Sequence, residues 1–81
     1  MHELSLVRGL VDVLTEKIEA EAIEQVERVK ISVGSWSHVD PRTLAFAFNV
    51  YKKHYPPLVE AELVYDEKHG EEIKLEWFEG V

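Results

Sequence analysis

The opening residues Met1-His2-Glu3 could form a metal chelate. The α-amine of Met1, the imidazole of His2 and successive backbone nitrogens would close fused chelate rings around one ion once the amine has lost its proton. The ordinary pKa of an α-amine, about 8, makes that deprotonation accessible. A square-planar set of nitrogens suits Ni(II) or Cu(II) and poorly suits Zn(II) or Mg(II). From the residues alone, the simpler alternative is an exposed terminal histidine without a ligand.

An amphipathic helix must position this terminus. The spacing of apolar residues predicts a helix from Leu4 to about Ile23. The N–H groups of the first helical turn have no intrahelical acceptor, so chelation by backbone nitrogens would cost the helix no hydrogen bond. The apolar positions with the spacing of one helical face are Val7, Leu10, Val11, Leu14 and Ile18.

A strand and a second helix follow. Val29, Ile31 and Val33 alternate with polar residues, which predicts a half-buried strand that ends at Gly34. Asp40-Pro41 predicts an N-cap followed by proline at the first helical position. The apolar stripe of this second helix comprises Leu44, Ala47, Phe48 and Tyr51, and Phe46 and Val50 widen it toward a mostly buried helix.

Two further strands complete the chain. Ala61, Leu63 and Tyr65 alternate with their neighbours, and Lys68-His69-Gly70 predicts a turn. In the last segment Ile73, Leu75 and Trp77 alternate with Lys74, Glu76 and Phe78. We therefore expect the last two strands to form an antiparallel hairpin. A crossover through the second helix could make the first two strands parallel.

The expected fold is α+β, in the order α-β-α-β-β, with two helices packed on one face of a small mixed three-stranded sheet. At 81 residues, with 46% hydrophobic and 31% charged residues, the chain predicts a single globular domain over residues 1–81.

Composition excludes several classes of function. Nine Lys and Arg against sixteen Asp and Glu give a formal charge of −7, which disfavours nucleic acid and anionic membrane surfaces as partners. The absence of cysteine excludes a thiolate zinc site. No recognisable nucleophile, base or phosphate loop supports an enzyme. With neither a secretion signal nor a membrane-spanning segment in the sequence, we expect a cytoplasmic protein.

Other candidate residues have ordinary structural interpretations. We expect His38, His54 and His69 to be exposed, because no pair has the i, i+4 spacing of two ligands on one helix. Asp40 is expected to act as a cap and not as a metal ligand. Acidic residues between Glu60 and Glu76 predict a solvated surface.

The aromatic residues leave open questions about contacts. Trp36 could anchor a partner or cover the edge of the core. Trp77 and Phe78, as strand neighbours, point to opposite faces of the sheet, so at least one of them could be exposed and support a homo-oligomer or partner docking.

Several segments together resemble the HypA/HybF family of hydrogenase-maturation nickel metallochaperones. They are Met1-His2-Glu3-Leu4-Ser5-Leu6, Val33-Gly34, Val39-Asp40-Pro41, Leu44-Ala45-Phe46-Ala47-Phe48 and Glu60-Ala61-Glu62-Leu63. The family combines a nickel-binding α/β domain with a zinc domain of paired C-x-x-C motifs inserted between its second and third strands. Here only Asp66 to Glu72 separate Tyr65 from Ile73, so this resemblance covers the nickel-binding domain and implies no zinc site.

The resemblance implies that Ni(II) binds at Met1, His2 and Glu3, with Glu3 contributing its backbone nitrogen. It further implies a non-catalytic chaperone that passes nickel to a GTPase-type maturation factor or a hydrogenase precursor, in hydrogenase or urease maturation. The alternative is a metal-free interaction module of the same fold, which would dock through Trp36 or the third strand while its N-terminus binds nothing.

Overall fold

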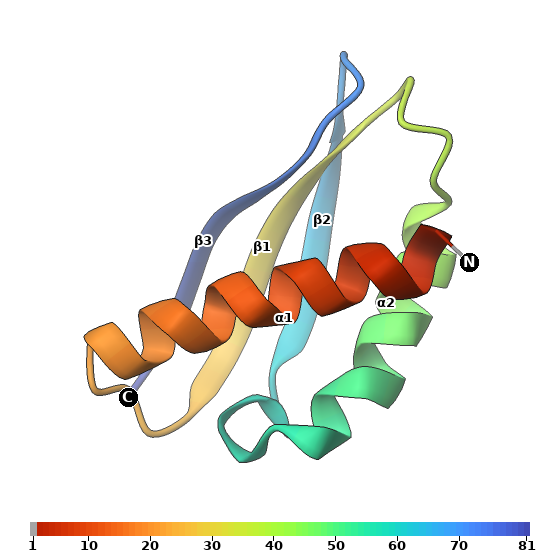
Figure 1. Cartoon of the computed structure of the whole chain (residues 1–81). Helices are drawn as coiled ribbons and strands as arrows, with labels where there is room; N and C mark the ends of the chain where they lie inside the picture. The colour runs from red at the N-terminus through yellow and green to blue at the C-terminus, as the bar shows by residue number, and fades with distance from the viewer. Residues whose placement is uncertain (1) are drawn as a thin grey trace.

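A computed structural model describes the backbone of residues 2–81 and the side chains of residues 4–81. Two helices lie on one face of a three-stranded sheet, and α1 crosses in front of the strands while α2 packs beside it (Figure 1). This arrangement confirms the expected α+β class and element order. The elements are α1 (His2–Ala20), β1 (Val26–Gly34), α2 (Pro41–Tyr51), the 3-10 turns η1 (Lys52–His54) and η2 (Pro56–Leu58), β2 (Glu62–Lys68) and β3 (Ile73–Gly80).

The sheet has the order β2-β1-β3, with β1 parallel to β2 and antiparallel to β3. The mixed sheet is confirmed, but the expected hairpin between the last two strands is wrong, because β1 lies between them. The central position suits β1 since Val29, Ile31 and Val33 are all almost completely buried. The α2 crossover makes β1 and β2 parallel, as such connections do.

The link from β2 to β3 passes over the end of β1. Backbone N–H groups of Gly34, Ser35 and Trp36 donate to the carbonyls of Glu72, Lys68 and Gly70, at 2.8, 2.7 and 2.8 Å respectively. Gly34 is required at this crossing, because a Cβ built there would lie 2.4 Å from the carbonyl oxygen of Gly70. These contacts close the sheet with a short connection between β2 and β3.

A β-bulge changes the expected faces of β3. Lys30 is opposite Trp77 and Ile31 is opposite Leu75, so Glu76 is an extra residue on the β3 side. The prediction that Trp77 shares a face with Ile73 and Leu75 is therefore wrong. Phe78 packs against the core in its place, and Trp77 lies on the opposite face, 43% exposed.

One apolar cluster joins the helices to the sheet. The stripe predicted for α1 is confirmed, with Leu10 partly buried and its other members in the core. The buried hydrophobic residues are Val7, Val11, Leu14, Ile18, Val26, Val29, Ile31, Val33, Leu44, Phe48, Leu58 and Ala61. Among the described residues, no helix is long and apolar enough to cross a membrane.

The prediction of a mostly buried second helix is wrong. Leu44 and Phe48 are almost completely buried, but Phe46 and Val50 are 70% and 50% exposed. The inner side of α2 packs against α1 and against the edge strand β2. Nothing in the described chain covers the outer side of the helix. The helix therefore exposes apolar surface that its sequence alone suggested would be buried.

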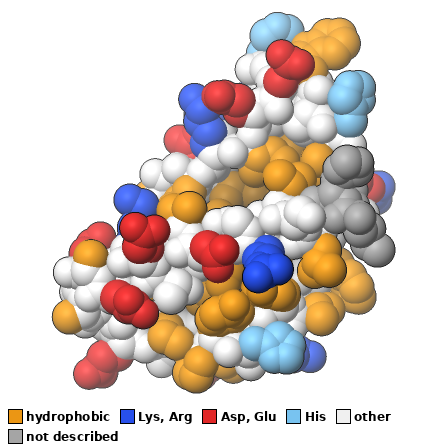
Figure 2. Space-filling model, in the orientation of Figure 1, with side chains coloured by type: hydrophobic (Ala, Val, Ile, Leu, Met, Phe, Trp, Pro, Cys, Tyr) orange, Lys and Arg blue, Asp and Glu red, His pale blue; other side chains and the backbone are white. Residues whose placement is uncertain are grey.

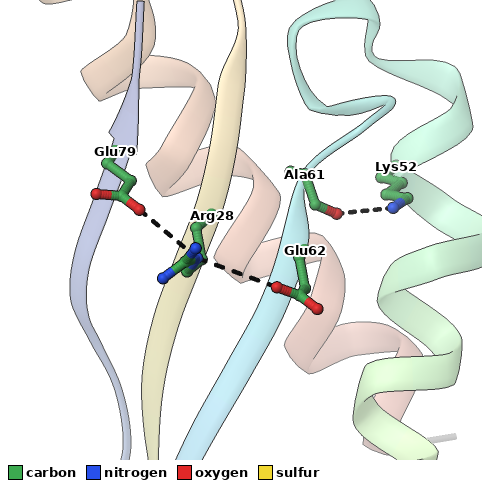
Figure 3. A network of polar contacts seen from close by, with 5 residues as sticks. All are labelled: Arg28, Lys52, Ala61, Glu62 and Glu79. Carbon is green, nitrogen blue, oxygen red and sulfur yellow. Dashed lines mark hydrogen bonds and ion pairs between the residues drawn. The ribbon is translucent and has the colours of Figure 1, made fainter.

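Polar contacts join the end of α2 to β2 and the three strands to one another. The Lys52 Nζ at the end of α2 donates to the carbonyl of Ala61, 2.7 Å away, just before β2 (Figure 3). On the sheet face opposite the helices, the Arg28 guanidinium reaches Glu79 at 3.5 Å and Glu62 at 4.0 Å, which links all three strands. The uncovered face of the sheet is thus crossed by ion pairs between neighbouring strands.

Candidate metal centre

The predicted chelate lies at the beginning of α1. Met1 is outside the described residues, as are the side chains of His2 and Glu3, so the geometry of this site stays a prediction. The backbone of α1 begins at His2. The N–H groups of His2 and Glu3 therefore belong to the first turn, where an α-helix has no acceptor of its own. The helix start at His2 is therefore compatible with metal binding by the backbone nitrogens of His2 and Glu3.

Packing of α1 against α2 and the sheet fixes the direction of the first turn. Val7 and Val11, on consecutive turns, are completely buried in the cluster that also contains Leu44 and Phe48 of α2. In Figure 1 the first turn of α1 lies at the end of the molecule where α2 begins. The core thus anchors the helix one turn after the proposed ligands and leaves its exposed Leu4 and Ser5 outside.

Asp40 caps α2, as predicted. Its Oδ1 accepts the backbone N–H of Arg42 at 2.9 Å and lies 3.6 Å from the Nε of the same arginine. The hydrogen bond from the Arg42 backbone, together with the nearby guanidinium, lowers the pKa of the Asp40 carboxyl below its ordinary value. The carboxylate is therefore used to stabilise the start of the helix.

The three other histidines are exposed, as expected. The rings of His69 and Trp36 meet edge to face, with centroids 6.4 Å apart. The rings of His54 and Tyr51 are arranged in the same way, with centroids 6.2 Å apart. His38 adopts a left-handed backbone with φ of 61° and shares a surface hollow with Trp36 and His69. Within the part of the chain that the structure describes, no three His, Cys, Asp or Glu side chains are grouped to hold a metal.

Both tryptophans among the aromatic candidates are exposed. Trp36 is 58% exposed in the loop after β1, so it does not serve mainly to cover the core. Trp77 lies on the uncovered sheet face while Phe78 packs inward, which confirms that the two neighbours face opposite ways. Both tryptophans remain available for contacts with other molecules.

Glu76 is a polar feature that the sequence did not reveal. At the bulge its carboxylate lies 3.5 Å from Lys68 Nζ. A hydrogen bond from the buried Ser32, and then the charge of Lys68, lower the pKa of the Glu76 carboxyl. The strict alternation read from the sequence cannot locate a bulge, and without the bulge this glutamate has no reason to meet Ser32. The contacts of Glu76 with Lys68 and Ser32 therefore stabilise the sheet and give this residue a structural role.

Comparison with known proteins identifies the class. The chain matches, over residues 1–74, the family described as "Hydrogenase/urease nickel incorporation, metallochaperone, hypA". The HypA maturation factor of Moorella thermoacetica is 35% identical over 68 residues, 84% of this chain and 59% of that protein. The corresponding factor of Lawsonia intracellularis is 33% identical over 51 residues, 63% of this chain and 43% of that protein.

Solved structures agree on the fold. The solution structure of the nickel metallochaperone HypA from Helicobacter pylori superposes with a TM-score of 0.76 over 90% of this chain and 68% of that one, at 19% identity. A second HypA solution structure gives a TM-score of 0.73 over 94% of this chain and 70% of that one, at 22% identity.

These findings show that the chain belongs to the HypA family, as its resemblance suggested. It spans 43% and 59% of the length of the two relatives described above. The family description and the relatives' names denote a metallochaperone and maturation factors, which agrees with the expectation that the chain is not an enzyme.

Proposed function

We propose that residues 1–81 form a nickel-binding domain that acts as a metallochaperone for nickel-enzyme maturation. The observation that carries this proposal is the family match, which extends over residues 1–74 and so includes the candidate chelate at its start. Nickel is the cargo, and the recipient is a GTPase-type maturation factor or a hydrogenase precursor, with urease maturation as a second destination. The proposed location is the cytoplasm.

The proposed ligands are the Met1 amine, the His2 imidazole and the backbone nitrogens of His2 and Glu3. Fused chelate rings of this kind require a free amine and give the all-nitrogen set that Ni(II) prefers. Two deprotonated amides would cancel the formal charge of the dication at the positive end of the α1 dipole. The start of α1 at His2 supports this arrangement, because first-turn nitrogens are free of helical acceptors.

A Ni(II) titration followed by absorption spectroscopy and calorimetry tests the site. The protein with its native N-terminus should bind one ion with the spectrum of a square-planar nitrogen site. His2→Ala, and a form extended by one residue before Met1, should each lose that spectrum and bind at least about tenfold more weakly, a loss of about 1.4 kcal/mol. The matched control is His69→Ala, which removes an exposed imidazole elsewhere and should bind as the parent does.

Equal binding by the native, His2→Ala and extended forms would contradict the proposed ligands. Loss of the signal in His69→Ala would move the site to the loop region near Trp36. The second candidate function is a metal-free interaction module of the same fold, and the exposure of Trp36 and Trp77 favours it. That candidate predicts no stoichiometric nickel binding by any of these forms.

A further inference from the structure

The outer side of α2 combines apolar and basic side chains. Arg42, Phe46 and Val50 follow one another at intervals of four residues, which places them on one side of α2. Lys53 follows three residues after Val50, in the 3-10 turn η1 that continues α2. The buried Leu44 and Phe48 occupy the opposite side. We call the four exposed residues the α2 outer face.

Phe46 and Val50 form the apolar centre of this face. They are separated by one helical turn and are 70% and 50% exposed, so neither contributes much to the core. A helix with apolar residues on all sides is typical of a buried position. The described chain does not bury this side, which suggests that another molecule does.

The charges at the two ends of the face are basic. Arg42 is 86% exposed even though its Nε lies 3.6 Å from the Asp40 carboxylate. Within the described residues Lys53 forms no ion pair with a carboxylate. Residues 41–59 contain three of the nine Lys and Arg residues of the chain and none of its sixteen Asp and Glu residues. The α2 region is therefore cationic in a protein whose formal charge is −7.

Apart from Asp40, which caps α2 and lies beside Arg42, few acidic residues lie near this face. In Figure 2 acidic side chains follow the outer side of α1, while hydrophobic side chains gather at the lower right, where Figure 1 places α2. A ligand attracted to the α2 outer face must avoid repulsion by Arg42 and Lys53 and must cover Phe46 and Val50. Complementary charge at the ends of an apolar stripe meets both requirements.

We propose that the α2 outer face is a docking site for an amphipathic helix of a partner protein, whose apolar stripe covers Phe46 and Val50 and whose acidic residues pair with Arg42 and Lys53. Two helices pack side by side at 8–10 Å, a distance that suits exposed aromatic and β-branched side chains. This inference does not depend on nickel binding.

Two synthetic peptides of about 18 residues, long enough to be helical, provide the probe. Both carry the same leucine stripe, and one has glutamates at its flanks where the other has lysines. We expect the acidic peptide to bind at least about tenfold more tightly at low salt, and its affinity to fall as salt is added. Chemical-shift changes in the protein amides should concentrate on α2.

The variant Phe46→Ser/Val50→Ser should reduce binding of the acidic peptide at least about tenfold while its circular dichroism and thermal midpoint stay near those of the parent. The matched control is Val13→Ser, which removes a 43% exposed apolar side chain from α1 and should leave the affinity unchanged. Arg42→Glu/Lys53→Glu should invert the preference between the two peptides.

Three results would overturn the proposal: equal binding of the two peptides, no binding of either, or undiminished binding by the serine variant. Sedimentation velocity supplies a further arm. A concentration-dependent dimer that disappears in Phe46→Ser/Val50→Ser would assign the face to a second copy of this chain and would contradict a separate acidic partner. Because none of these measurements includes nickel, their outcome is separate from that of the metal titration.

Discussion

Two uncovered surfaces of this protein are composed differently. The sheet face opposite the helices is crossed by ion pairs, among them Arg28 with Glu79 and Lys30 with Asp66, the latter at 3.0 Å. On the α2 outer face two large apolar side chains are exposed between basic ones. The sheet face pairs these charges between its own strands. On the α2 outer face Arg42 is paired with Asp40, but Phe46 and Val50 are exposed, and Lys53 has no ion pair among the described residues.

The largest expected difference is between two phenylalanines of α2. Phe48→Ala should destabilise the protein by about 3–5 kcal/mol because it leaves a cavity in the core. Phe46→Ala should change the free energy of unfolding by less than about 0.5 kcal/mol, since the side chain is mostly in water. Urea denaturation of both variants measures the contrast. Comparable losses would show that Phe46 is buried in solution and would remove the basis of the docking site.

The crossing of β1 with the β2–β3 connection gives the next effect. Gly34→Ala should cost about 1–3 kcal/mol, because its Cβ would meet the Gly70 carbonyl and force the backbone apart. Gly9→Ala is the control: its Cβ meets nothing within 4 Å, and alanine in a helix interior should stabilise by up to about 1 kcal/mol. Thermal unfolding should separate the two variants in opposite directions from the parent.

The ion pairs on the sheet face should contribute less. Arg28→Ala should lower stability by less than about 1 kcal/mol, since Arg28 and both of its glutamate partners are about half exposed or more. The loss should shrink in 1 M salt, where exposed pairs are screened. A double-mutant cycle of Arg28→Ala with Glu79→Ala isolates the pair. A coupling that is unaffected by salt would contradict a surface electrostatic contribution.

The smallest expected effect is the titration of the α2 cap. The Asp40 pKa is lower in the folded protein than in the unfolded chain, so its contribution to stability is present above the unfolded pKa and is lost as pH falls through the folded pKa. Asp40→Asn keeps a capping side chain that does not titrate. Its unfolding free energy should therefore depend less on pH across the acidic range than that of the parent, as denaturation at several pH values can show. The same pH dependence of the unfolding free energy in the parent and in Asp40→Asn would contradict a contribution of the ionised Asp40 carboxylate to stability.

Local pattern was sufficient for much of the fold. The helical period of Val7, Val11 and Leu14 predicts the buried side of α1, and Asp40-Pro41 predicts where α2 begins. Both features depend on residues close in sequence, and the same contacts exist in the final structure. The family segments also led to the right class, which the match over residues 1–74 establishes.

Features that depend on distant strands were not predictable in this way. A turn at Lys68-His69-Gly70 suggested a hairpin, yet β3 pairs with β1, because the most apolar strand gains more by taking the centre of the sheet. The bulge at Glu76 reverses the faces of Trp77 and Phe78 and brings the glutamate to Ser32. Sequence alternation carries no information on where a strand gains an extra residue.

The sequence by itself determined the types of the elements, the cap of α2 and the acidic charge, because these are properties of single residues and short spacings. Only the tertiary structure decided the strand order, the inward position of Phe78 and the exposure of Phe46 and Val50. The physical reason is that burial depends on which other elements are available to cover a surface. For α2, the residues that the structure describes cover only the inner side of the helix.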